Sequence, residues 1–477
     1  MKEILDIFEK ISSIPRCSKN EGQISQWLCE WAKDNGFKWN SDKSGNIVMN
    51  IPATKGYENS PILILQSHMD MVCEKNKESS HDFSKDPIKL VYDGDWVTAS
   101  ETSLGADNGI GMAIALAIGK DKTIEHPDIE LLFTVDEETG LNGANALDPD
   151  ILKGRILINL DTEDDEYFII GCSGGNETKI ALSLEYAPLP ENYGSFVLKV
   201  DGIMGGHSGI DINKHRANAI QILTRALYES LDSVDFRLIS IKGGSAHNAI
   251  PREASAIIAF DSSLLLSIKK AMGQFYATVQ NEFSSEKKIS VSIAECLDQY
   301  KDAALSFDTK KAVNLLMALP HGVYRLSELS EKLVETSNNL AIVDIKNNSL
   351  EILTSQRSSI VSRLSEITNK IEATVFLSGG KANTGRHYPP WYPDFESKLL
   401  KRCKQVYQDI FLKDPIGLIV HAGLEAGIIA SKFDEMDVIS CGPKLENPHS
   451  PNERLNISSI HKVWTFLTGL LKSYGNQ

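Results

Sequence analysis

Long apolar runs are missing from the 477-residue chain. The longest candidate, residues 110–119 (IGMAIALAIG), is short and interrupted by glycine, whereas a membrane-spanning helix needs about 20 apolar residues. Glu3, Asp6 and Glu9 interrupt the N-terminal segment, which therefore lacks the pattern of a signal peptide. We expect a cytoplasmic protein that does not span a membrane.

Basic residues are in the minority. The chain has 49 Lys and Arg against 64 Asp and Glu, which gives a formal net charge of -15. A general nucleic-acid binder needs a basic face, and an anionic membrane surface attracts basic segments. The charge balance therefore predicts neither nucleic acid nor membrane as a partner.

Cysteine is scarce, and its seven residues form neither a CxxC pair nor a dense framework. Scattered cysteines of odd number in a long chain without a signal peptide are typical of reduced thiols in the cytoplasm. The same scarcity argues against a closed structural zinc site, which is usually built from cysteine.

The chain is too long for a single hydrophobic core, so two or three domains are expected. Helical and apolar strand-like segments alternate up to a Pro-rich boundary near 185–194, and the pattern returns after a loop-like segment at 379–394. Such alternation favours an α/β domain with a mostly parallel central sheet. We predict a discontinuous α/β domain, residues 1–185 and 385–477, interrupted by a large α+β domain, residues 186–384.

Periodicity and turn residues predict the individual elements. The expected helices are 2–12, 21–35, 108–119, 214–231, 309–318, 358–371 and 457–473. The expected strands are 46–51, 62–66, 129–135, 156–160, 167–171, 195–202, 236–244 and 254–262, with a hairpin at 340–359 that turns at Asn347 and Asn348, and a further element at 371–380.

Polar residues follow several predicted strands where each strand ends. His68 and Asp70 follow the apolar run 62–66, and Asp161 follows the strand ending at 160. The acidic residues Asp136, Glu137 and Glu138 follow Val135, and Asp107 lies in a Gly-rich turn directly before a helix. Taken singly, each has an ordinary explanation as a structural histidine, a helix cap or a solvated acidic loop.

The combination is more specific, because the carboxyl ends of strands in an α/β sheet share one edge. Carboxylates gathered there repel one another unless cations neutralise them. Histidine with Asp and Glu is the ligand set of Zn²⁺, Mn²⁺ or Co²⁺, and a set without cysteine that is open to water favours catalysis. A site with two metals needs a bridging carboxylate and a free general base. The adjacent residues Glu137 and Glu138 offer a ligand and a base, and their spacing does not say which is which.

The motifs SHMDMV, GADNGIG, DEETG, NLDTE and GGHSG resemble those of the dinuclear zinc aminopeptidase and carboxypeptidase superfamily. The resemblance extends from the N-terminus to the last helix. The segments CSKNEG, SLGADNGIG, HAGLE and PHSP are most similar to its aminoacyl-histidine dipeptidase branch. It implies a dinuclear metal-dependent peptidase that cleaves small dipeptides of the Xaa-His type, with Zn as the first expectation and Mn or Co as alternatives.

The resemblance also implies a role for each motif residue. His68 and Asp161 would bind one metal, Glu138 and His449 the other, and Asp107 would bridge them. Asp70 would orient His68, Glu137 would act as general base, and the peptide bond from Asp107 to Asn108 is often cis in this superfamily.

The inserted domain would then be a lid whose closure delivers substrate-binding residues. The resemblance implies that His207 polarises the scissile carbonyl and that Arg357 grips the substrate carboxylate, although Arg363 is a nearby alternative. Asn248 matches a motif of the family, and His421 and Glu425 are expected to line the substrate pocket. Dimers that pair through the lid are a further implication.

Three other functions fit part of the pattern. An N-acyl amino acid deacylase or a carboxypeptidase would use the same metal residues. A metal-binding protein without catalysis would usually have lost the base or a ligand, and Glu137, Asp70 and five ligand candidates are all present. A thiol hydrolase would use Cys73 near His68, but no separate base is apparent for it.

Overall fold

The computed structural model describes residues 1–231 and 234–475, which form two compact units. The first, here called the α/β unit, comprises Met1–Cys172, Trp391–Ile419 and Leu424–Gln477. The second, the inserted unit, comprises Ser173–Pro390 and Val420–Gly423. A discontinuous α/β domain interrupted by an α+β insertion is thus confirmed. The chain enters the inserted unit before residue 185, because its strand β9 (Gly174–Ser183) precedes the Pro-rich segment.

An eight-stranded sheet forms the centre of the α/β unit, in the order β1-β2-β6-β3-β7-β23-β8-β22. The four strands β6, β3, β7 and β23 run parallel to one another, whereas β1, β2 and β8 pair antiparallel. The bounds in spatial order are β1 Lys38–Ser41, β2 Ile47–Ile51, β6 Ile129–Thr134, β3 Leu63–His68, β7 Ile156–Asn159, β23 Asp437–Ser440, β8 Tyr167–Cys172 and β22 Ile416–Val420. Every residue of β3 and β6 is buried, as expected for parallel strands covered on both faces.

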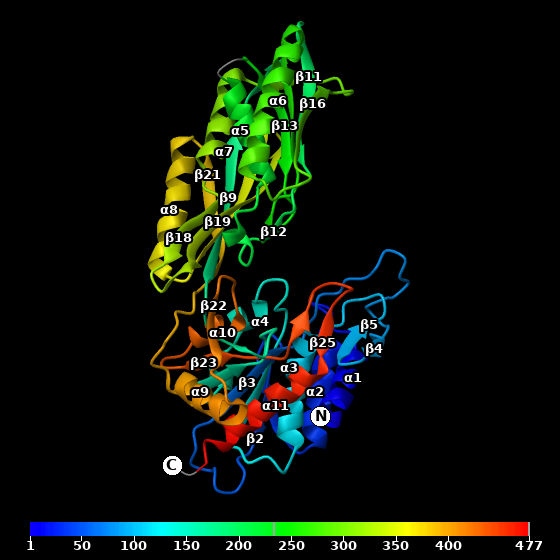
Figure 1. Cartoon of the computed structure of the whole chain (residues 1–477), viewed down its shortest axis with the longest axis vertical. Helices are drawn as coiled ribbons and strands as arrows, with labels where there is room; N and C mark the ends of the chain where they lie inside the picture. The colour runs from blue at the N-terminus through cyan, green and yellow to red at the C-terminus, as the bar shows by residue number, and fades with distance from the viewer. Residues whose placement is uncertain (232–233, 476–477) are drawn as a thin grey trace. The chain divides into compact units, whose positions relative to one another are not determined.

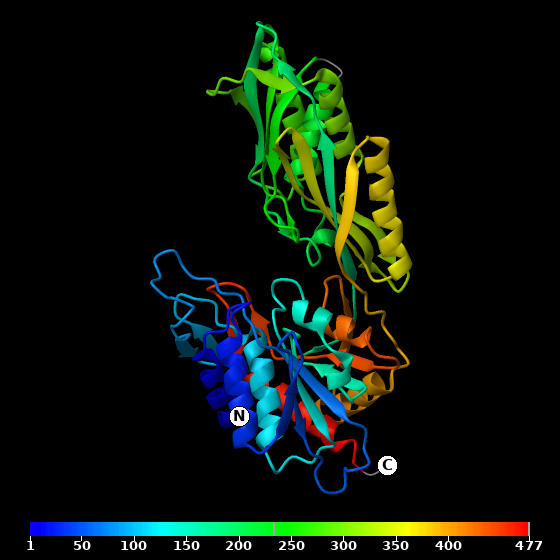
Figure 2. The ribbon, with the colours of Figure 1, turned by 180° about the vertical axis from the view of Figure 1, so that it is seen from behind.

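Helices cover both faces of this sheet. Helices α9 and α11 face the viewer in Figure 1, and α1 and α3 face the viewer in Figure 2. The bounds are α1 Lys2–Ser12, α2 Gly22–Asp34, α3 Ala106–Lys120, α4 Asn142–Ala146, α9 Lys398–Phe411, α10 Glu425–Ala430, α11 Ile457–Lys472 and the short helix η1 Pro149–Ile151. The apolar run 110–119 forms the body of α3, which is buried because it packs directly on β3 and β6. Among the described residues, no helix is long and apolar enough to cross a membrane.

A small antiparallel sheet of the α/β unit has the order β24-β25-β5-β4. Its strands are β24 Leu445–Glu446, β25 Arg454–Asn456, β5 Trp96–Ala99 and β4 Leu90–Asp93. The loop from β24 to β25 contains both His449 and Glu453, so this sheet fixes the base of that loop.

The inserted unit is a long antiparallel sheet with helices α5, α6, α7 and α8 on one face (Figures 1 and 2). The strand order is β16-β11-β15-β13-β19-β20-β9-β21, with β18 beside β19. The strands are β11 Tyr193–Asp201, β13 Arg237–Gly243, β15 Ala254–Asp261, β16 Ser290–Glu295, β18 Gly322–Ser327, β19 Ser330–Lys346, β20 Ser349–Ser358 and β21 Lys381–Tyr388. The helices are α5 Ala219–Leu231, α6 Leu265–Glu282, α7 Ser306–Ala318 and α8 Val361–Leu377, with short helices η2 Ile212–Lys214 and η3 Ser262–Leu264. Two small ribbons pair β10 Tyr186–Pro188 with β17 Asp302–Ala304, and β12 Gly206–His207 with β14 Ala249–Ile250.

Two features of the inserted unit differ from the sequence prediction. The segment 371–380 is not a separate element, because α8 continues to Leu377 with Ile367, Ile371 and Val375 buried along one face. The segment expected to be a loop at 379–394 contains β21, an edge strand beside β9. The hairpin of β19 and β20 does turn at Asn347 and Asn348, whose positive φ values of 50° and 58° fit a tight hairpin turn.

The expectation that all cysteines are reduced thiols is wrong for Cys17 and Cys73, which form a disulfide with a Cα–Cα distance of 5.7 Å. The two residues are 56 positions apart, and they meet because Cys17 pairs with Met71 in an isolated parallel bridge. In this structure Cys73 has no thiol that could act as a nucleophile, which removes the thiol-hydrolase alternative.

A histidine of the inserted unit gives the first testable prediction. Nδ1 of His321 accepts from the Asn218 amide at 3.1 Å, and burial lowers the pKa of His321 to about 4 from 6.5. The unfolded chain then binds a proton between these values that the folded chain does not. The stabilisation is therefore complete above pH 6.5 and is lost as the pH falls toward 4, by at most about 3 kcal/mol.

The measurement is thermal unfolding of the wild type and His321→Asn at pH 7 and pH 5. Asparagine keeps an oxygen acceptor for Asn218 but does not titrate. We expect the wild-type melting temperature to fall further than that of the variant, whereas equal decreases would contradict the assignment.

Candidate metal centre and active site

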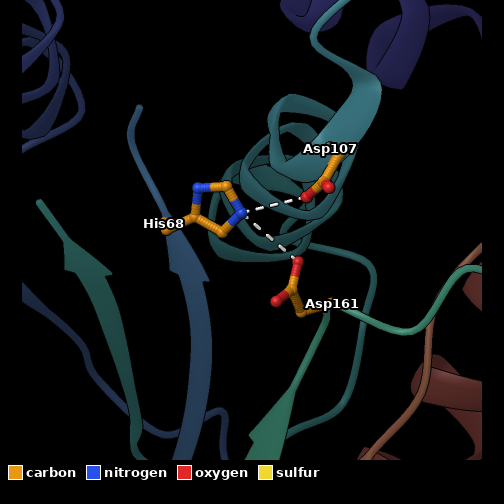
Figure 3. A group of neighbouring side chains, drawn as sticks. All are labelled: His68, Asp107 and Asp161. Atoms are coloured by element: carbon orange, nitrogen blue, oxygen red, sulfur yellow. Dashed lines mark hydrogen bonds and ion pairs between the residues drawn. The ribbon is translucent and has the colours of Figure 1, made fainter. Parts of the chain in front are cut away.

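His68 is the last residue of β3, and Asp70 follows it on the same edge of the sheet. Nδ1 of His68 lies 3.3 Å from Oδ1 of Asp70, so this carboxylate holds the ring from behind. Nε2 points the other way, toward Oδ1 of Asp107 at 3.0 Å and Oδ1 of Asp161 at 3.4 Å (Figure 3). A ring fixed through one nitrogen by a carboxylate is the usual arrangement of a metal-binding histidine.

Asp107 lies in the first turn of α3, and its two carboxylate oxygens face two different histidines. Oδ1 is the oxygen near His68, whereas Oδ2 lies 2.9 Å from Nε2 of His449. The peptide bond from Asp107 to Asn108 is cis, and the Asn108 amide donates to the carbonyl of Leu160 and to Asp161. One carboxylate with an oxygen toward each of two groups has the geometry of a bridging ligand.

Two triads result, and Asp107 belongs to both. His68, Asp107 and Asp161 form the first, and Asp107, Glu138 and His449 the second; within each triad the potential ligand atoms all lie within 4.8 Å of one another. His449 reaches Glu138 at 3.0 Å from the loop between β24 and β25. The structure therefore brings together the five residues that the resemblance assigned as ligands.

The acidic turn after β6 is held by two carboxylates through its backbone. Asp70 accepts from the N–H of Glu137 at 2.9 Å and of Glu138 at 3.2 Å. Oε1 of Glu21 accepts from the N–H of Asp136 at 3.0 Å. Three successive N–H groups are thus fixed, which directs the side chains of Glu137 and Glu138 toward His68, with potential ligand atoms of the three within 4.8 Å of one another.

The electrostatics show an excess of negative charge at this edge. Burial and the neighbouring Glu138 raise the pKa of Glu137 well above its usual value, and burial together with Asp107 raises the pKa of Glu138 to about 7. Burial and Asp107 also raise the pKa of Asp161. These carboxylates are held at mutual distances that two divalent cations would stabilise. The donor set of imidazole and carboxylate fits Zn²⁺, Mn²⁺ or Co²⁺.

Comparison with known proteins identifies the family. The sequence model of peptidase family M20/M25/M40 matches residues 64–473. The chain belongs to this peptidase family. This M20 peptidase is therefore a hydrolase of peptide bonds, and the resemblance read from the motifs is confirmed at the level of the family.

Three known proteins cover nearly the whole M20 peptidase chain. It is 39% identical over 467 residues to the cytosol non-specific dipeptidase of Escherichia coli (strain K12), covering 98% of this chain and 96% of the relative. The crystal structure of aminoacylhistidine dipeptidase from Vibrio alginolyticus superposes with a TM-score of 0.86 at 35% identity, covering 99% of this chain and 96% of that one. A tripeptidase from Staphylococcus aureus subsp. aureus Mu50 shares the fold, with a TM-score of 0.57 at 18% identity over 100% of this chain and 99% of that one.

The inserted unit of the M20 peptidase has a polar cluster of its own. Nη1 of Arg357, on β20, donates to the Tyr388 hydroxyl at 2.8 Å. Ser337 lies opposite Arg357 on β19, and its hydroxyl is 2.7 Å from Nε2 of His421. Arg357 and His421 are 6% and 8% exposed, yet Nε of the former and Nδ1 of the latter have no hydrogen-bond partner among the residues that the structure describes. Such buried polar atoms are suited to a polar ligand.

His207 and Asn248 lie on the ribbon of β12 and β14. His207 pairs with Ala249, and the N–H of Ser208 donates to the carbonyl of Asn248 at 2.7 Å. Nδ1 of His207 accepts from the N–H groups of Gly209 and Ile210, each at 3.2 Å. In the neutral ring the proton must then be on Nε2, which makes this nitrogen a hydrogen-bond donor.

Glu425 is expected to line the substrate pocket, and Arg363 is the alternative to Arg357 as the residue that binds the substrate carboxylate. Glu425 is fully buried in the α/β unit, where its carboxylate accepts from Thr134 at 2.6 Å and Gln66 at 2.7 Å. It is bonded to side chains of β3 and β6, and its role in lining the substrate pocket stays a prediction. Arg363 forms an ion pair with Glu366 at 2.7 Å on the surface of α8.

Sequence reasoning missed Arg16, Glu21 and Glu453, which bind backbone groups of the ligand-bearing turns. Glu21 is part of the quoted CSKNEG motif, and Glu453 follows His449 by four positions in PHSPNE. Their positions in these motifs could have identified Glu21 and Glu453 from the sequence. Arg16 follows a proline after an amphipathic helix and gives no such signal.

Proposed function

We propose that this M20 peptidase is a dipeptidase that depends on two divalent metal ions. The observation that carries the proposal is the pair of triads sharing Asp107, with Glu137 beside them. The dipeptidase part is supported by the relatives from Escherichia coli and Vibrio alginolyticus, which are named as dipeptidases. We further propose Xaa-His dipeptides among its substrates, Zn as the native metal, and a cytoplasmic location, as the name of the Escherichia coli relative suggests.

We propose that His68 and Asp161 hold one cation, Glu138 and His449 the other, and Asp107 both. When bound, the cations supply positive charge that lowers the pKa of a water and polarises the substrate carbonyl. Glu137 accepts the proton of the attacking water and then passes it to the leaving amine, as a general base followed by a general acid. Asp70 keeps this geometry, because it holds both the His68 ring and the backbone of Glu137.

The inserted unit contributes substrate-binding groups in this proposal. His207 donates from Nε2 to the oxygen of the scissile carbonyl as negative charge develops there, a role supported by its tautomer. Asn248 lies on the same ribbon and orients the peptide. Arg357 binds the α-carboxylate of the substrate with its guanidinium fork, and His421 shapes the wall of that subsite through Ser337.

A small substrate panel tests the proposed function. It contains Xaa-His dipeptides, other dipeptides, a tripeptide and an N-acetyl amino acid, each assayed with metal, with chelator and after metal is restored. Metal-restorable cleavage confined to dipeptides supports the proposal. Cleavage of the acetylated compound alone indicates a deacylase on the same scaffold. No cleavage despite two bound metals per chain indicates a binding protein.

Arg357→Gln is expected to raise the KM for dipeptides by about 10–100-fold, because a charge-assisted hydrogen bond to the substrate carboxylate is lost. The matched control is Arg363→Gln, since Arg363 is bonded to Glu366 on the surface of α8. Steady-state kinetics on one dipeptide and on its C-terminal amide provide the measurement. If the Arg357 variant discriminated between acid and amide as well as the wild type, another residue would have to bind the carboxylate.

A further inference from the structure

Glu453 lies in the loop of His449 and is 2% exposed. Oε2 accepts from the N–H groups of Leu104 at 2.8 Å and Gly105 at 2.9 Å. Oε1 accepts from the N–H groups of Ala106 at 2.8 Å and Asp107 at 3.3 Å. A single side chain thus binds four successive N–H groups of the turn that carries the shared carboxylate of the two triads.

For two of the four N–H groups, those of Ala106 and Asp107 at the start of α3, this arrangement replaces an ordinary helix cap. The first N–H groups of a helix have no partner within the helix and are usually satisfied by a side chain at the N-cap position. The N-cap of α3 is Gly105, which has no side chain to offer. Glu453 takes that role from 346 positions further along the chain, measured to Asp107. The cap therefore couples the turn of Asp107 to the loop of His449.

Arg16 binds the same turn through a backbone carbonyl group. Its guanidinium donates to the carbonyl of Met69 at 3.0 Å, to that of Asp70 at 2.8 Å, and to that of Gly105. Burial lowers the pKa of Arg16 only to about 10, so the group stays charged at neutral pH. Arg16 therefore ties the segment after His68 to the turn before Asp107.

Glycine leaves the space that this guanidinium needs. A Cβ at Gly105 would lie 2.7 Å from Nη2 of Arg16, and a Cβ at Gly109 would lie 2.6 Å from the same atom. Gly105 also has a φ of 68°, in the left-handed region that other residues rarely adopt. The sequence of the turn is thus matched to Arg16.

We propose that Glu453 and Arg16 are positioning residues of the metal centre. They set metal affinity by holding Asp107, His449 and His68 at fixed positions relative to one another. Glu453 fixes the spacing of Asp107 and His449, and Arg16 fixes that of Asp107 and His68. Neither side chain belongs to the two triads of potential ligands. The inference rests on the proposed function, because it assumes that the triads hold metal ions.

Glu130 is a matched control for Glu453. It is also 2% exposed, and its carboxylate also binds backbone N–H groups, those of Lys153 at 3.0 Å and Gly154 at 2.9 Å. It lies near the start of β6, whereas the triads lie beyond the carboxyl ends of the strands. Replacing either glutamate with glutamine removes a similar buried contact, but only Glu453 touches the turn of Asp107.

The test compares Glu453→Gln and Glu130→Gln with the wild type. Glutamine keeps the size, but its NH₂ group cannot accept, so two of the four N–H groups lose their partner. We measure Zn²⁺ and Co²⁺ affinity by competition with a chromogenic chelator, and the melting temperature of the metal-free protein. Glu453→Gln is expected to bind at least one metal about 10–100-fold more weakly, because the loss of a residue that supports a metal ligand commonly lowers metal affinity by this factor. Glu130→Gln is expected to bind both metals as the wild type does.

Each outcome decides the question. Two metals bound to Glu453→Gln with wild-type affinity would overturn the inference, as would an equal loss of affinity in Glu130→Gln. Should Glu453→Gln fail to fold, Arg16→Lys carries the test: lysine keeps the charge but lacks the fork for three carbonyls, and wild-type affinity in that variant overturns the inference. A wild type that binds no metal overturns the proposed function itself, which separates the two failures.

Discussion

Replacing Glu137 with glutamine is expected to reduce kcat by about 10²–10⁴-fold, the range of a general acid–base catalyst, while both metals stay bound. Glutamine has the same size, and the N–H of residue 137 can still donate to Asp70 as it does at 2.9 Å in the wild type. The amide cannot take a proton from water. The measurement is kcat on a dipeptide together with metal content by mass spectrometry.

The neighbouring Glu138→Gln is the control that separates the two roles. Glu138 is one of three groups around the second candidate cation position, with His449 at 3.0 Å. Its loss is expected to lower the metal content first and turnover as a consequence. If Glu137→Gln lost a metal while Glu138→Gln kept both and lost turnover, the two roles would have to be exchanged. Wild-type kcat in Glu137→Gln would exclude it as the base.

Spacing could not assign these roles, although the sequence did predict where the residues gather. His68, Asp107 and Asp161 follow parallel strands or begin a helix, and the geometry of an α/β sheet brings such positions to one edge. Where each side-chain oxygen or nitrogen points depends instead on the turn that carries the residue. The turn of Glu137 is held by Asp70 and by Glu21. These contacts are between side chain and backbone, which leave no periodic pattern in the sequence.

His449 shows a second limit. Read from the residues alone, it is a histidine in a Pro-flanked loop, and only the resemblance to the peptidase superfamily singled it out. Its position comes from the pairing of β24 with β25 and of β25 with β5, and β5 lies far from the other two strands in the chain. Glu453 and Arg16 were missed for the same reason, since both act on residues more than 50 positions away.

The errors in the fold have local causes. The polar strand β21 (KANTGRHY) has no apolar alternation, because it lies at the edge of its sheet beside β9 alone. Helix α6 was not predicted, and its buried residues Ile268, Met272, Phe275 and Val279 recur at helical spacing among many polar neighbours. By contrast, the mainly apolar strands β3 (LILQSH) and β6 (IELLFT) were easy to recognise, because they are buried on both faces.

Asp107→Asn is expected to have an effect at least as large as that of Glu137→Gln, but through metal binding. The two carboxylate oxygens of Asp107 face His68 at 3.0 Å and His449 at 2.9 Å. An asparagine offers one oxygen and one NH₂ group, so it can serve only one of the two candidate cation positions. We expect one metal to be lost or bound at least about 100-fold more weakly, with kcat reduced accordingly.

The control for this variant is Asp121→Asn, at the other end of the same helix, where the carboxylate accepts from Thr123 at 2.9 Å. It changes the same functional group and leaves both triads intact, so two metals and wild-type turnover are expected. Metal content of purified protein and a titration of apoprotein with Co²⁺, followed by its visible absorption, measure the difference. Two tightly bound metals in Asp107→Asn would mean that the two cations do not share this carboxylate, because an asparagine with a single side-chain oxygen cannot bind both cations.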